Sequence, residues 1–148
     1  MDPLSQDLRS VIAEAEPALL RTVSEEAASA VPPNQGWSKK QELGHLLDSA
    51  TNNRVRFIRA SLEGGFAAPS YDGDGWVRMG GHGDAPWSEL VDLWAALNRA
   101  LVRVLDRIPH DRLSATCRVG DNEPVTLAFL IEDYVAHMQH HLDHILTR

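Results

Sequence analysis

Near the C-terminus the sequence reads Ala136-His137-Met138-Gln139-His140-His141-Leu142-Asp143-His144. His137 and His141 are four residues apart, and residues at this spacing are neighbours on a helix, so both imidazoles can point at one ion. At about 100° per residue, His141 falls inside the apolar stripe of the predicted helix and His137 at its edge, whereas His140 and His144 turn toward solvent. Buried imidazoles need partners, which either a metal ion or hydrogen-bonding neighbours could supply.

This stretch belongs to a longer amphipathic segment, one of four in the chain. It begins after Thr126, a good N-cap residue, and its apolar residues recur at helical spacing as far as Ile145. Similar patterns predict helices over residues 3–23, 38–63 and 86–108. Four long amphipathic helices predict an all-α fold, a four-helix bundle.

Particular residues mark the ends and breaks of these helices. Asp2 is expected to cap the first helix, and Pro17 to kink or end it. Ser38 begins the second helix with a capping-box pattern, because a glutamine follows three residues later. Gly64 is expected to end the second helix and Pro109 the third.

Two long irregular segments join the helices and predict crossover connections. Residues 64–84 are glycine-rich and without a regular period, which is uncommon in a compact domain unless the segment is functional. Tyr71, Trp76 and His82 are therefore candidates for a flap over a pocket; the alternative is an ordinary crossover with a short helix around Trp76. Residues 109–125 are expected to contain a small hairpin before the last helix.

The composition narrows the class of protein. A length of 148 residues fits a single domain over residues 1–148. The net charge of −7 argues against a nucleic-acid partner, which would require a basic face. No apolar run approaches the ~18 residues of a membrane span, and the N-terminus has no signal-peptide pattern, so a cytoplasmic location without a membrane partner is expected. Cys117 is the only cysteine and can form no internal disulfide.

A further histidine, His45, lies in the second predicted helix. Its helical neighbours are mainly polar, so periodicity alone places it on a polar face, either exposed or lining a groove between helices. The residues do not decide between these two arrangements.

The combination of motifs resembles the DinB/YfiT-like superfamily. The resemblance rests on Trp37-Ser38, on residues 43–46 (Leu-Gly-His-Leu), and on the His-x-x-x-His pair of the final helix. It implies a four-helix bundle with a metal held by three histidines, which map onto His45, His137 and His141.

One part of the motif departs from the commonest pattern of the family. Many members follow the last histidine with Arg-Gly-Gln, whereas this chain has Leu142-Asp143-His144, which is closer to the YfiT-type ending. The departure leaves His140 and His144 as alternative ligands or as residues that contact the ligands.

The resemblance also implies a class of activity. The expected function is a metal-dependent enzyme of the hydrolase or thiol-dependent transferase type, acting on a small-molecule substrate and forming a homodimer. Zinc is the first choice of metal, with nickel, iron or manganese as alternatives, and a low-molecular-weight thiol is a candidate cofactor. The competing hypothesis is a non-catalytic metal-binding protein with a stress-response or interaction role; a fourth protein ligand, such as His144 or a loop aspartate, would favour it.

Several other residues carry weaker hypotheses. Cys117 is either a nucleophile or a buried filler, and the filler is preferred. Arg56 shares a helical face with His45 and could hold a substrate carboxylate. Tyr134 could donate a hydrogen bond to a metal-bound ligand or be a core residue with its hydroxyl at the surface. Three acidic residues among glycines are either functional carboxylates or turn formers: Asp72, Asp74 and Asp84. The apolar stripe of the third helix, with Trp87 and Trp94, is a candidate dimer surface or simply core.

Overall fold

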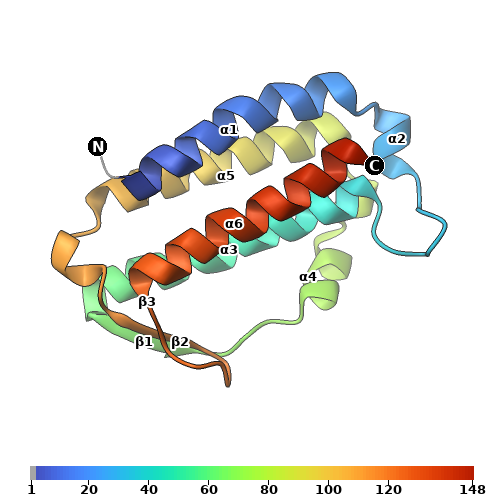
Figure 1. Ribbon diagram of the computed structural model, residues 1–148. Coiled ribbons are helices and arrows are strands. Elements are labelled where there is room, and N and C mark those ends of the chain that lie inside the picture. Colours follow the sequence, from blue (N-terminus) through green and yellow to red (C-terminus); the bar gives the residue numbers. More distant parts are fainter. Residues whose placement is uncertain (1–2) are drawn as a thin grey trace.

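Four long helices form the body of the molecule in a computed structural model that describes residues 3–148. They pack as a four-helix bundle, which confirms the fold class expected from the sequence (Figure 1). The predicted cap at Asp2 lies outside the described residues. The bounds of the long helices are α1, Pro3–Thr22; α3, Lys39–Glu63; α5, Trp87–Arg107; and α6, Leu127–Thr147.

The helices do not simply alternate in direction along the chain. Figure 1 shows that α3 and α5 run in the same direction, and that α1 and α6 run the opposite way. The long connection between α3 and α5 makes this arrangement possible, because it returns the chain along the bundle before α5 begins. As a result α6 lies antiparallel beside α3 although about sixty residues separate them in sequence.

The helix boundaries follow the expected capping signals. Ser38 and Gln41 form the predicted capping box, with the Gln41 amide donating to Ser38 Oγ at 3.2 Å and the Ser38 amide donating to Gln41 Oε1 at 2.9 Å. At the other end, Gly64 adopts a left-handed conformation with a φ of 80°. The Phe129 amide donates to Thr126 Oγ1 at 3.1 Å and starts α6.

Pro17 does not end the first helix, which was one of its two expected effects. Helix α1 continues past this residue to Thr22, and a short helix α2, Glu25–Ser29, follows it. Pro17 is exposed, whereas Ala15 and Leu19 on either side of it are buried in the core. Packing of the buried face therefore outweighs the loss of one backbone hydrogen bond at the proline.

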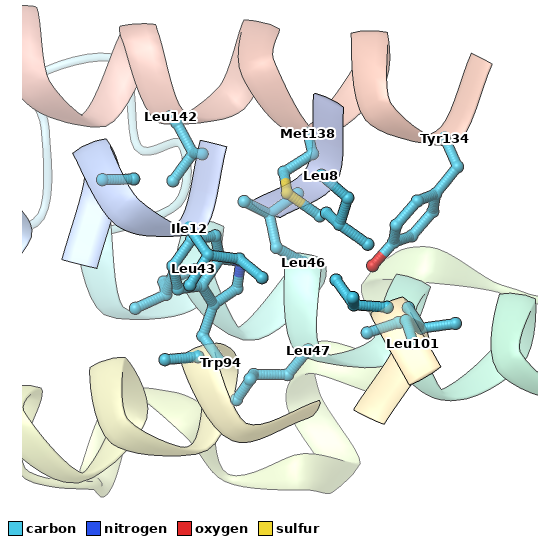
Figure 2. Packing of buried hydrophobic residues seen from close by; sticks show 14 of the residues in the cluster. Leu8, Ile12, Leu43, Leu46, Leu47, Trp94, Leu101, Tyr134, Met138 and Leu142 are labelled. Atoms are coloured by element: carbon cyan, nitrogen blue, oxygen red, sulfur yellow. The ribbon is translucent and has the colours of Figure 1, made fainter. Parts of the chain in front are cut away.

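The core lies between the four long helices and contains leucines, aromatic residues and one methionine (Figure 2). Trp94 is fully buried and Trp87 is 3% exposed, so the apolar stripe of α5 is core of this chain. The stripe therefore gives no support to the expected homodimer, which stays a prediction. Leu8 and Ile12 come from α1, Leu43, Leu46 and Leu47 from α3, and Tyr134, Met138 and Leu142 from α6.

The two crossovers meet in a small sheet at one end of the bundle (Figure 1). Strand β2, Thr116–Val119, pairs antiparallel with β3, Val125–Thr126, which confirms the expected hairpin. Strand β1, Gly65–Ala68, was not expected and pairs parallel with β2. A Cβ at Gly65 would lie 2.6 Å from the Thr116 carbonyl oxygen, so the close approach of these strands requires glycine there.

The connection between β1 and α5 contains a short helix, α4, Gly73–Gly80, which includes Trp76. A 3-10 turn, η1, His82–Asp84, follows it, and a similar turn, η2, His110–Arg112, precedes β2. The helix around Trp76 matches the plainer of the two readings of this segment. Within residues 3–148, no helix combines the length and the apolar character needed to cross a bilayer.

Candidate metal centre

Three histidines meet at the contact between α3 and α6. His45 comes from the first third of α3, and His137 and His141 come from successive turns of α6. The Nε2 atoms of His45 and His137 are 3.4 Å apart, and those of His137 and His141 are 3.2 Å apart. All three side chains are half-buried, and one ring nitrogen of each lies within 4.8 Å of the others. The structure thus brings together the three residues selected from the sequence.

These separations match the coordination geometry of a small metal ion. A tetrahedral zinc ion binds imidazole nitrogens at about 2.0–2.1 Å, which places two such nitrogens about 3.3 Å from each other. The separations of 3.2 and 3.4 Å therefore fit a single shared ion. No carboxylate and no fourth imidazole from residues 3–148 joins the three histidines in this cluster.

Hydrogen bonds among three neutral imidazoles do not satisfy these contacts. The Nε2 of His137 faces the Nε2 atoms of both His45 and His141. This nitrogen carries either one lone pair or one hydrogen, so it can form one well-directed hydrogen bond but not two. A cation placed among the three lone pairs satisfies all of them, so the donor set fits a metal ion.

A buried carboxylate orients one of the three rings. Glu42, one turn before His45 on α3, is 4% exposed. Its Oε2 lies 2.8 Å from His141 Nδ1, and its carboxylate also contacts His144 Nδ1 and Arg148 Nη2 at 2.9 Å. Burial raises the pKa of Glu42, but hydrogen bonds from His141 and His144 outweigh this and lower it. The ionised carboxylate must accept, so a neutral His141 carries its proton on Nδ1 and presents an Nε2 lone pair to the cluster.

The cluster favours neutral imidazoles. Burial, with the neighbouring His141 and His45, lowers the pKa of His137 to about 4. Burial and His141 also lower the pKa of His45. Neutral imidazole is the form that binds metals, so these two rings are ready to act as ligands at neutral pH.

His45 is not exposed, which was one of the two arrangements expected from the sequence. Periodicity failed there because the first half of α3 is covered on nearly all sides, and even Lys40, Asp48 and Ser49 are buried. One side faces α6 and another is covered by α4 and η1, so polar residues do not mark a solvent-exposed face. His45 occupies the second of the expected arrangements, a polar region between helices.

The structure explains two residues of the motif around His45, Trp37 and Gly44. The Trp37 ring lies 5.0 Å from the His45 ring, centroid to centroid. At Gly44 a Cβ would lie 2.3 Å from the ring of His82, whose Nε2 is 3.1 Å from Asp48 Oδ1. Gly44 therefore lets η1 lie directly on the backbone of α3. The Nδ1 of His45 is buried and has no hydrogen-bond partner among residues 3–148.

The remaining sequence candidates lie outside the cluster. His140 and His144 are exposed, as periodicity indicated, although His144 also contacts Glu42. Cys117 is buried in β2, which agrees with the filler role. Tyr134 is a core residue, as one of its two interpretations expected, but its hydroxyl is not at the surface and donates to Asn98 Oδ1 at 2.7 Å inside the core.

The three loop aspartates behave mainly as turn residues. Asp72 caps α4, and its Oδ1 accepts from the Gly75 amide at 3.1 Å. Asp74 and Asp84 are exposed. Glu42 and Asp48 are the polar residues that sequence reasoning missed. The sequence offered one signal for Glu42: it is a carboxylate three residues before His45, in a chain whose last helix carries His141 and His144 three residues apart.

Two cavities flank the histidines. One of about 220 Å³ opens on the His137 side, and its lining includes Ser49, Arg56 and Tyr71. The other, of about 290 Å³, opens on the His141 side, and its lining includes Trp37 and Glu42. Of the three flap candidates, Tyr71 lines a cavity, Trp76 packs against Tyr71 with ring centroids 5.4 Å apart, and His82 packs on α3.

The chain belongs to the DinB superfamily, whose family model matches residues 12–145. It is 28% identical over 123 residues to a Bacillus subtilis protein named "Putative metal-dependent hydrolase YfiT", in a match that covers 74% of this chain and 62% of that protein. A Bacillus cereus protein named "Putative metal-dependent hydrolase" is 26% identical over 112 residues, which cover 76% of this chain and 64% of the relative. The chain thus spans less than two thirds of the length of these relatives.

Solved structures show the same fold. The structure of YfiT from Bacillus subtilis, described as a probable metal-dependent hydrolase with an unusual four-helix bundle topology, matches with a TM-score of 0.84 and 25% identity. The match covers 97% of this chain and 82% of that one. A mycothiol-dependent maleylpyruvate isomerase matches with a TM-score of 0.76 at 12% identity, covering 95% and 60%, and at that identity it supports the fold alone.

Proposed function

We propose that this protein is a metal-dependent hydrolase of small molecules that binds one divalent ion through His45, His137 and His141. The observation that carries the proposal is the approach of three Nε2 atoms at 3.2 and 3.4 Å, which hydrogen bonds among neutral imidazoles cannot satisfy together. The names of the Bacillus relatives support the same class of activity. Zinc is the preferred ion because neutral imidazoles suit it, with nickel, iron and manganese as alternatives.

The chain's own residues perform three tasks in this proposal. The imidazoles hold the ion through Nε2, and Glu42 keeps the proton of His141 on Nδ1. Trp37 covers one face of His45. A bound divalent ion lowers the pKa of water and stabilises negative charge that develops on a substrate oxygen. The cavity beside His137 gives a small substrate a place next to the ion.

The number of ligands in the cluster favours an enzyme over the non-catalytic alternative. A structural zinc site is usually closed by four protein ligands, whereas a catalytic one keeps a position open. Here His144 contacts Glu42, and the cluster within residues 3–148 has three members. A site of three ligands with adjoining cavities favours catalysis over a sensing or stress-response role.

A thiol-dependent transferase is the competing enzymatic hypothesis, with a low-molecular-weight thiol as a fourth ligand of the ion beside the three histidines. Hydrolysis of p-nitrophenyl acetate separates the two. As a hydrolase, the zinc-loaded protein should release p-nitrophenol without added thiol, and the rate should fall to background after chelation and return with one equivalent of zinc. Turnover that appears only when cysteine or another small thiol is supplied would reject the hydrolase in favour of the transferase. A homodimer and a cytoplasmic location remain further predictions.

A further inference from the structure

Arg56 is a half-buried cation in the cavity beside His137. Among residues 3–148, no carboxylate forms an ion pair with it. The guanidinium lies over the ring of Tyr71, whose centroid is 5.6 Å from the guanidinium carbon. Other arginines of the chain, such as Arg9, Arg59 and Arg99, each pair with a carboxylate.

The surroundings of Arg56 leave its charge uncompensated. Burial lowers the pKa of the Arg56 guanidinium, which shows that the cation loses hydration in this position. Burial also raises the pKa of Tyr71, so the tyrosine stays neutral at pH 7 and supplies no negative charge. Removing a charge from water without a partner is costly, and a bound anion would offset that cost. The chain has 21 acidic residues, yet none of those within residues 3–148 forms an ion pair with Arg56.

Arg56 and the histidines lie along one path. His45, Ser49, Asn53 and Arg56 follow one another on the same face of α3, at spacings of four, four and three residues. The rise of α3 separates the Cα atoms of His45 and Arg56 by about 16 Å. Ser49, Asn53, Arg56 and His137 all line the same cavity.

The charges in the cavity orient an anionic ligand. Asp133 also lines the cavity, and its charge acts on His137. In the metal-free protein Asp133 therefore repels an anionic group near the histidines, whereas Arg56 attracts one farther along α3. A molecule with a negative end and a reactive end should bind with the negative end at Arg56.

We propose that this cavity binds a small molecule bearing a carboxylate, that Arg56 binds the carboxylate, and that the rest of the molecule extends toward the three histidines. The inference rests on the proposed function for the role of the bound molecule as substrate, but the binding of the anion does not need the metal. Arg56 would then be a specificity-determining residue, because a guanidinium accepts a planar carboxylate through two parallel hydrogen bonds.

The first test measures the binding of butyrate to the metal-free protein by calorimetry. Arg56→Gln should weaken butyrate binding about tenfold or more, since hydrogen bonds to charged groups are the strong ones. Arg54→Gln is the matched control, because Arg54 is exposed on the same helix two residues away. Arg56→Lys should retain part of the affinity, and circular dichroism verifies that each variant is folded. Wild-type affinity in Arg56→Gln, an equal loss in Arg54→Gln, or inorganic phosphate bound more tightly than butyrate would overturn the proposal.

The second test links the anion site to the ion. Cobalt-loaded protein is titrated with 4-mercaptobutyrate and with butanethiol, and the thiolate-to-cobalt absorption band reports binding. The carboxylate should give 4-mercaptobutyrate an advantage that Arg56→Gln removes and Arg54→Gln keeps. If the protein fails to bind cobalt, the proposed function fails while the butyrate result still decides the anion site. Equal binding of the two thiols to the wild-type protein would contradict the orientation proposed here.

Discussion

At the scale of single residues, the candidate centre depends on a carboxylate in addition to the three histidines. Glu42 is buried and contacts two imidazoles and a guanidinium. Its charge fixes the tautomer of His141, and partners of this kind commonly decide how well a histidine binds a metal. A survey of histidine spacing alone would therefore describe only part of the site.

Glu42→Gln should weaken metal binding about 10- to 100-fold, the usual effect of removing a partner of a ligating histidine. The amide lacks the negative charge that holds the proton on His141 Nδ1. Competition with a chromogenic zinc chelator measures the affinity. Glu132→Gln, an exposed change on α6, serves as the control and should leave the affinity unchanged. An affinity for Glu42→Gln equal to that of the wild-type protein would show that the contact does not tune the site.

At the scale of elements, the contact between α3 and η1 depends on a missing side chain. Gly44 faces the His82 ring, and an added Cβ would lie 2.3 Å from it. Alanine is the better helix former by about 1 kcal/mol, so propensity and packing oppose one another at this position. The ring is held by Asp48 and cannot move freely, so packing should decide the outcome.

Gly44→Ala should destabilise the protein by about 1–3 kcal/mol, as overpacking in a core does. Thermal or denaturant unfolding measures the change. Gly83→Ala is the control, because its nearest neighbour would be a Gln41 side-chain atom at 3.7 Å, an ordinary contact. In a His82→Ala background the effect of Gly44→Ala should vanish or change sign. Destabilisation that persists in that background would refute the steric explanation.

The elements also show what the sequence could and could not predict. Capping by Ser38 and Thr126 and the end of α3 at Gly64 act through local hydrogen bonds and backbone conformation, so these boundaries were predictable. Strand β1 was not, because its pairing with β2 joins residues about fifty positions apart. An end of the first helix at Pro17, one of the two expected effects, did not occur because burial of the neighbouring residues decided the outcome.

The residues of the candidate site likewise fall into those that the sequence could predict and those that it could not. The spacing of His137 and His141 is a local property of α6 and was visible in the sequence. The inward position of His45 depends on which elements cover α3, so periodicity failed there and the resemblance to the DinB superfamily supplied the residue. Glu42 was missed because its partners lie about a hundred residues away.

At the scale of the whole molecule, the histidine cluster should make the metal-free protein sensitive to acid. The folded-state pKa of His137 is about 4, below the ordinary 6.5, because of burial and the neighbouring His141 and His45. Between these values the unfolded chain binds a proton that the folded chain does not, so stability falls as the pH falls. The contribution is fully present above about pH 6.5 and is lost toward pH 4.

The loss should be on the order of 2 kcal/mol after allowance for solvent screening. Urea unfolding of chelator-treated protein at a series of pH values measures it. His137→Asn should flatten the slope between pH 6.5 and 4, whereas His110→Asn, at an exposed histidine outside the cluster, should not. A metal-free protein whose stability is constant across this range would contradict the assignment of a neutral, buried His137.

The central claim is that α3 and α6 together form a single metal site, and zinc titration by calorimetry tests it most directly. The wild-type protein should bind one zinc ion per chain. His45→Asn should weaken binding about 100-fold or more, because it deletes one of three protein ligands, while His140→Asn, on the exposed side of α6, should bind as the wild type does. If His45→Asn retains one zinc with wild-type affinity, the three-histidine site is wrong.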